Sequence, residues 1–174
     1  MFLTTDDLEA GVPHVEASPR DAGTLELIVR RPAVDQREVV ERAELGVEDG
    51  LVGDGWAARG QPDPERQLTL MNWRAAALFS PDEERRSLAG DQLFVDLDLR
   101  GDNLPAGSRL AIGDAVVEVT PPPHRGCRNF SARFGGGALR LVNSPIGVAL
   151  NLRGINARVV RGGSIARGDV IRRL

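Results

Sequence analysis

Residues 113–134, GDAVVEVTPPPHRGCRNFSARF, contain the only cysteine of this 174-residue chain. The β-branched run at 116–119 predicts a strand, because such side chains pack well on a pleated surface. The three prolines at 121–123 are expected to end that strand, since proline has no N–H for a sheet ladder. Cys127 is therefore predicted to lie on a loop just beyond a strand, with the rest of the chain as a scaffold around it.

The residues next to Cys127 in sequence suit a reactive thiol. Arg125 and Arg128 are always charged, His124 is charged when protonated, and no carboxylate is nearby in sequence. Positive charge favours the thiolate, which is the form that attacks, carries sulfur or binds a soft metal. The alternative is a buried cysteine that acts as a small hydrophobic residue. The local sequence leaves both interpretations open.

Composition restricts the chemistry and the class of protein. The length is typical of one domain, and a single cysteine cannot form an internal disulfide. The chain has no signal-peptide-like start and no run of membrane-spanning length, so we expect a cytoplasmic protein without a membrane partner. All 22 basic residues are arginine, and tyrosine is absent. Without lysine, the chain cannot form the Schiff base that holds pyridoxal phosphate.

Charge is distributed unevenly along the chain. Between positions 119 and 168 there is no acidic residue, while eight arginines occur there: Arg125, Arg128, Arg133, Arg140, Arg153, Arg158, Arg161 and Arg167. This contrast predicts that the cysteine-bearing third faces an anion, such as a phosphate, a pterin-type cofactor or a nucleic acid. The alternative is that these arginines are scattered over a solvated surface.

Alternating apolar and polar residues predict several strands, among them 24–31, 94–99 and 155–160. In the second of these, Asp96 and Asp98 are expected to face water. Residues 107–116 and 163–170 resemble each other, and both look like a turn that leads Gly-Asp into a strand. Two such corners indicate a β-barrel. Because the glycines at 135–137 are expected to break the chain, we predict a mostly β fold with a few short helices.

Segments spread over most of the chain resemble the MOSC domain, the family named after the C-terminal part of molybdenum cofactor sulfurase. They occur in the order found in that family, and the most specific is the single loop cysteine after GDAVVEVT. The others are the segments GLVGD at 50–54, LAGD at 88–91, DNL at 102–104, PHRGC at 123–127 and LRGINARV at 152–159.

The resemblance implies a MOSC-type β-barrel in a single domain, residues 1–174, with a lead-in at 1–23 and the barrel at 24–174. It also implies a stand-alone MOSC-domain protein that binds molybdenum cofactor (molybdopterin). Cys127 would then ligate molybdenum or carry sulfur as a persulfide. The residues expected to hold the cofactor are His124, Arg125, Arg128, Asn103 and Arg153.

In such proteins the activity is that of a molybdenum-cofactor-dependent oxidoreductase, which can reduce N-hydroxylated compounds, or of a sulfurtransferase component. The implied partner is a cysteine desulfurase or an electron-transfer protein. A nucleic-acid-binding β-barrel that uses the basic third is one alternative, but only Phe130 and Phe134 could offer stacking platforms among its arginines. A regulatory interaction domain without the chemistry is the other alternative.

Overall fold

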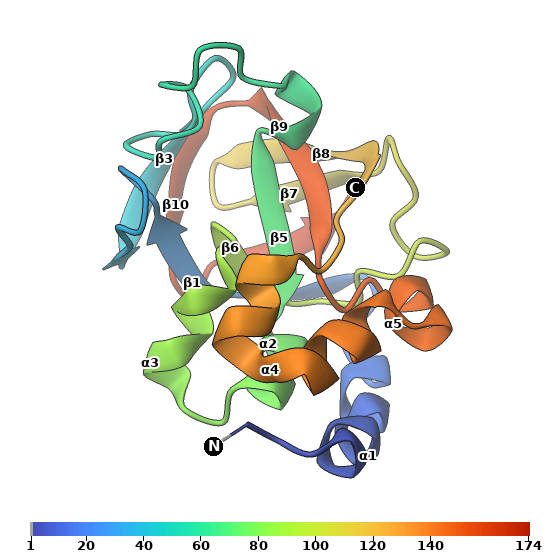
Figure 1. Ribbon diagram of the computed structural model, residues 1–174. Helices are drawn as coiled ribbons and strands as arrows, with labels where there is room; N and C mark the ends of the chain where they lie inside the picture. Colours follow the sequence, from blue (N-terminus) through green and yellow to red (C-terminus); the bar gives the residue numbers. More distant parts are fainter. Residues whose placement is uncertain (1) are drawn as a thin grey trace.

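The computed structural model describes residues 2–174 and contains a seven-stranded β-barrel beside a layer of helices (Figure 1). In order around the barrel, the strands are β11 (Val170–Arg173), β7 (Arg109–Ile112), β8 (Ala115–Pro123), β9 (Ile155–Arg161), β5 (Leu68–Asn72), β6 (Leu93–Asp96) and β1 (Ala22–Arg30). Antiparallel pairing of β1 with β11 closes the ring. The predicted β-barrel is therefore confirmed.

The remaining elements lie outside the ring. Strand β2 (Glu38–Val40) pairs with β1, while β10 (Gly163–Ala166), β3 (Arg42–Gly46) and β4 (Gly50–Leu51) form a separate small sheet. The helices are α1 (Thr5–Glu16), α2 (Trp73–Phe79), α3 (Glu83–Arg86), α4 (Arg128–Asn143) and α5 (Pro145–Ala149), with 3₁₀ turns η1 (Pro64–Arg66) and η2 (Ser87–Ala89). Strands β5 and β6 are parallel, so they need a crossover, which α2, α3 and η2 provide.

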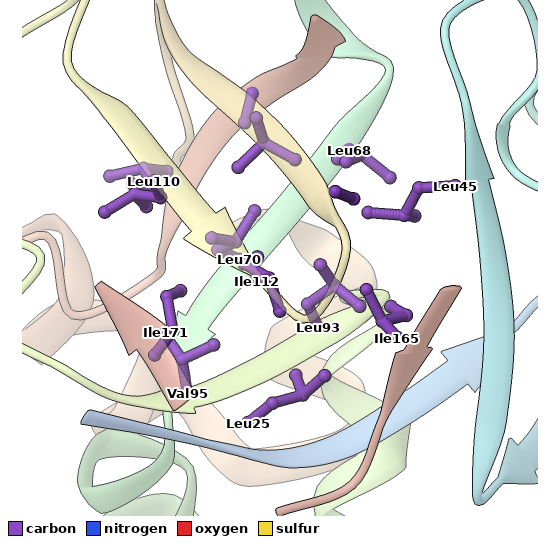
Figure 2. Packing of buried hydrophobic residues seen from close by; sticks show 14 of the residues in the cluster. Leu25, Leu45, Leu68, Leu70, Leu93, Val95, Leu110, Ile112, Ile165 and Ile171 are labelled. Atoms are coloured by element: carbon purple, nitrogen blue, oxygen red, sulfur yellow. The ribbon is translucent and has the colours of Figure 1, made fainter. Parts of the chain in front are cut away.

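Side-chain alternation along the strands builds two cores. On β6, Leu93 and Val95 point into the barrel, where Figure 2 shows them among the labelled leucines and isoleucines. Phe94, between them, faces the opposite way and packs with the helices. A period of two puts successive side chains on opposite faces of a sheet. Strand β6 therefore joins the barrel interior to the helical layer.

The helical layer is larger than the sequence indicates: 29% of the chain is helical and 32% is in strands. Helix α1 has 12 residues, and its Leu8, Val12 and Val15 are buried in the second core. The 16 residues of helix α4 form two helical segments, because Gly135 has a non-helical backbone with a φ of 91°, so the glycine run interrupts the helix as expected. No helix among residues 2–174 is both long and apolar enough to cross a membrane.

Two local expectations were wrong. Strand β8 continues through the prolines to Pro123, because its pairing with β9 is interrupted between Val119 and Pro123 and the missing N–H groups are not needed there. Asp98 does not face water but is buried, and it accepts hydrogen bonds from the Arg100 guanidinium at 2.7 to 3.0 Å. A charged partner two residues away makes this burial tolerable.

Candidate functional site

Cys127 lies on the short connection between β8 and α4, as predicted, and is the N-cap residue of α4. Its thiol makes no capping hydrogen bond, and its carbonyl oxygen accepts the N–H of Ser131 at 3.1 Å. The residue is exposed, which excludes the buried, purely hydrophobic role. Because a helix N-terminus carries partial positive charge, the cysteine lies where anions are favoured.

A cleft of about 470 Å³ opens beside Cys127, in the size range of small-molecule sites. We call it the arginine cleft, because five arginines line it together with His124 and Cys127: Arg31, Arg37, Arg59, Arg133 and Arg153. Asp35 is the one acidic residue in the described lining. The cleft therefore has a strong excess of positive charge around an accessible sulfur.

The arginines of the cleft come from both halves of the sequence. Arg31, Arg37 and Arg59 belong to the acid-rich N-terminal part, outside the cysteine-bearing third that was predicted to face an anion. Arg125 and Arg128, which flank Cys127 in sequence, are exposed and are not among the residues that line the arginine cleft. Arg125 instead lines a neighbouring hollow of about 180 Å³ that shares His124. Neighbours in sequence were therefore a poor guide to neighbours in the cleft.

Two arginines of the cleft are held by buried carboxylates. Arg31 donates from Nε and Nη2 to Asp54 at 3.0 and 2.9 Å, and from Nη1 to the Gly90 carbonyl at 2.8 Å. Burial alone would raise the pKa of Asp54, but the hydrogen bonds and charge of Arg31 outweigh it and lower the pKa below its ordinary value. Arg31 is thus fixed in position while its charge is largely balanced.

The second fixed arginine belongs to a buried cluster behind the cysteine. Arg153 donates from Nη1 to Asp91 Oδ2 at 2.6 Å, and His124 Nε2 lies 3.1 Å from Asp91 Oδ1. Arg153 is only 6% exposed and also stacks over the Phe130 ring at 5.1 Å. Its Nε is buried without a partner in the described structure. The sequence prediction named His124 and Arg153, and the structure brings both to the cleft.

Arg37, Arg59 and Arg133 form no ion pair with a carboxylate in the part of the chain that the structure describes. Arg37 Nε is buried and unpartnered. Burial, followed by the positive charges of Arg133 and Arg31, lowers the pKa of Arg37. Like charges gathered with Asp35 as the one acidic residue in the described lining indicate a site for an anion.

Gly90 has no side chain, which leaves open space between two of these guanidinium groups. A Cβ atom on this glycine would lie 3.5 Å from Arg133 Nη1 and 3.8 Å from Arg37 Nη2. The glycine has a φ of +92°, a conformation that side chains rarely adopt. The space that a side chain would fill is therefore free for a ligand oxygen to approach both arginines.

Asn103 is not part of the cleft. It is 2% exposed, and its amide nitrogen donates to the carbonyls of Arg20 and Asp98 at 2.9 and 2.8 Å. Its side-chain oxygen accepts from Arg173 at 3.2 Å. All its polar atoms are thus engaged in holding loops together, so we assign it no ligand contact.

No cluster of three or more His, Cys, Asp or Glu side chains suited to a metal ion occurs among the described residues. Cys127 is accordingly the only soft ligand that the cleft offers. A metal ion bound there would therefore need most of its ligands from outside the described part of the chain.

Solved structures with the same fold have low sequence identity to this chain. YiiM from Escherichia coli has a TM-score of 0.58 at 19% identity, with 87% of this chain and 69% of that chain covered. The YUAD protein from Bacillus subtilis has a TM-score of 0.60 at 17% identity, with 86% and 94% covered. YiiM from Geobacillus stearothermophilus has a TM-score of 0.55 at 12% identity, with 90% and 74% covered.

These similarities establish the fold. A comparison with curated proteins found no match. The family model described as the MOSC domain matches residues 69–172, which run from β5 to β11 and include Gly90, Asp91, His124, Cys127 and Arg153. Since that match covers more than half of the sequence and agrees with the barrel and its loop cysteine, the chain belongs to the MOSC domain family.

Proposed function

We propose that the arginine cleft binds the molybdenum cofactor, a phosphorylated pterin anion, with Cys127 beside it as sulfur ligand or sulfur carrier. One observation carries this proposal: five arginines line one cleft together with an exposed cysteine, and three of them have no carboxylate partner in the described structure. Arginine is suited to the task, because its planar fork binds phosphate oxygens in pairs and keeps its charge.

The residues present fit such a ligand. The unpartnered Nε atoms of Arg37 and Arg153 mark two places in the cleft that lack an acceptor. The open space at Gly90, between Arg37 and Arg133, suits the phosphate group. Arg31 and Arg153 are fixed by Asp54 and Asp91, so the walls are preorganised.

Each residue has a defined task in this proposal. Arg37 and Arg133 bind the phosphate, Arg153 and His124 also line the cleft, and Cys127 presents its sulfur from the N-terminal end of α4. The bound cofactor would supply the two-electron chemistry of molybdenum, as needed to reduce N-hydroxylated compounds. An electron-transfer protein would then be the required partner.

Sulfur transfer is the other use of the same cysteine. The Cys127 thiolate attacks the outer sulfur of a persulfide on a cysteine desulfurase, and a new S–S bond forms. The desulfurase cysteine leaves as a thiolate, and the outer sulfur remains on Cys127 as a persulfide. The exposure of Cys127 supports access by such a protein partner.

A general nucleic-acid surface is less well supported. Phe130 is 1% exposed and Phe134 is 6% exposed, so neither offers a face on which a base could stack. The three arginines of the cleft that have no carboxylate partner in the described structure line a concave surface. Single-stranded DNA is therefore included as a competitor in the test.

The test is calorimetric titration with a phosphorylated pterin. Arg37→Met should weaken binding by about 1.5 to 3 kcal/mol, the value of a hydrogen bond to a charged group. Arg161→Met is the matched control, because Arg161 is exposed in the acid-free third and does not line the cleft. Equal losses in the two variants, or competition by single-stranded DNA at similar concentrations, would show a diffuse polyanion surface instead.

A further inference from the structure

The buried Asp91 and Arg153 form a cluster with the partly buried His124, and the net charge of this cluster depends on the histidine alone. Asp91 is 0% exposed, and each of its oxygens faces one partner, Arg153 at 2.6 Å and His124 at 3.1 Å. Burial would raise the pKa of Asp91, but Arg153 and then His124 outweigh it and lower the pKa to about 2. Asp91 is therefore a carboxylate at neutral pH, and with a neutral imidazole the cluster carries no net charge.

The carboxylate also determines which imidazole nitrogen bears hydrogen. A carboxylate only accepts hydrogen bonds, so the neutral imidazole donates from Nε2 and its Nδ1 is the unprotonated nitrogen. Within residues 2–174, Nδ1 has no hydrogen-bond partner and is not among the buried unpartnered atoms. His124 lines the arginine cleft with Cys127. Nδ1 is thus the nitrogen left free for a ligand, on a side chain that borders both the arginine cleft and the neighbouring hollow.

Arg153 attracts an anion only weakly, because Asp91 neutralises the charge of Arg153. An anion close to Arg153 and His124 meets a neutral cluster unless His124 gains a proton. The other charged or titratable groups around the cleft are Asp35, Asp54 bound to Arg31, four further arginines and the Cys127 thiol, with Arg125 on the same loop. Arginine keeps its proton, and the chain has no lysine or tyrosine. Histidine is the side chain suited to gain a proton near neutral pH.

We propose that an anion binds in the arginine cleft together with a proton on Nδ1 of His124. The proton comes from solvent and stays on Nδ1, where it can be donated to a ligand oxygen, and no other bond forms or breaks. His124 is then the proton donor of the cleft, and Asp91 is the positioning residue that fixes its tautomer. This inference rests on the proposed function in one respect, namely that the ligand of the cleft is an anion.

Sulfate is the probe, because it remains a dianion throughout the pH range of the test. Calorimetric titration at pH 6 to 7.5, in two buffers with different ionisation heats, counts the protons taken up with each sulfate. The wild-type protein should take up a fraction of one proton, and its sulfate affinity should fall with rising pH, by at most tenfold per pH unit. His124→Gln, which can still donate to Asp91, should show no uptake and a flat pH profile.

The chain's second histidine supplies the control. His14 is exposed on α1 and does not line the cleft, so His14→Gln should behave as the wild type. Nitrogen-15 NMR adds a direct readout: without sulfate, His124 should show the Nε2–H tautomer, and sulfate should shift its Nδ1 signal toward that of imidazolium. The His14 signals should not move.

Three results would overturn the inference: proton uptake that persists in His124→Gln, sulfate binding without uptake in the wild type, or no sulfate binding. Each can occur while the phosphorylated pterin still binds and Arg37→Met still weakens it, so the proposed function would survive. Conversely, proton-linked sulfate binding that depends on His124, in a protein that binds no pterin, would support this inference and refute the proposed cofactor.

Discussion

Replacing Asp91 by asparagine should destabilise the protein strongly, although the two side chains have nearly the same shape. The substitution removes the carboxylate that faces Arg153 at 2.6 Å and His124 at 3.1 Å. The Arg153 side chain is only 7% exposed, so its charge would be left in the interior without compensation. Breaking a buried ion pair in this way costs about 3 to 5 kcal/mol.

The pH dependence gives a second estimate with a definite sign. The pKa of Asp91 in the folded protein is about 2, below its ordinary value of 3.8. A depressed pKa contributes stability above pH 4 that is lost as the pH falls toward 2, and the difference amounts to about 2 kcal/mol. The cost of Asp91→Asn should therefore be fully present at pH 7 and should shrink below pH 4.

Urea denaturation measures both effects. Glu118→Gln is the matched control, because Glu118 also faces two arginines, Arg109 and Arg158, which are 57% and 47% exposed. Such solvated pairs contribute up to about 1 kcal/mol. Heat should unfold Asp91→Asn at a temperature lower by roughly 6 to 20 °C. If Asp91→Asn costs no more than Glu118→Gln at pH 7, the buried pair does not stabilise the fold as argued.

Three further outcomes are expected. Gly107→Ala should lower the free energy of unfolding by about 1 to 2 kcal/mol, because Gly107 has a φ of +91°. Gly154→Ala should lower it more, since the added methyl group would also press on the Leu70 carbonyl. Urea denaturation of both variants checks this. Phe130→Ala should cost about 3 to 5 kcal/mol by thermal or urea unfolding, because its ring packs at 5.4 Å from that of Phe79 and beneath Arg153. Iodoacetamide should label Cys127 in the folded protein to completion, because this residue is exposed. Mass spectrometry should detect no label on the Cys127→Ser variant. A folded wild-type protein that resists labelling would contradict the exposed position.

The barrel could be predicted because its signal is local. The strand predicted at 94–99 overlaps β6, and the apolar residues Leu93, Phe94 and Val95 are buried on the two faces of that strand. The extent of the helices could not be predicted in the same way. Helix α4 is interrupted at Gly135, as the glycine run predicted, but the helical segment before it, 128–134, was not predicted; its buried Phe130 and Phe134 stabilise it by tertiary packing.

The site was only half predictable for a related reason. His124, Cys127 and Arg153 lie in segments that carry the family resemblance, and the structure brings them together. Arg31 and Arg37 lie among acidic residues, so sequence charge gave no signal for them. Their role becomes visible only when Asp54 is found bound to Arg31 and Arg37 is left unpaired beside Arg133.

The most direct test of the account is the molybdenum content of protein purified from a host that makes the cofactor. The wild-type protein and Arg161→Met should carry molybdenum and pterin in equal amounts, whereas Arg37→Met should lose most of both. Wild-type protein without molybdenum, or an equal loss in Arg161→Met and Arg37→Met, would contradict the claim that the arginine cleft is a cofactor site.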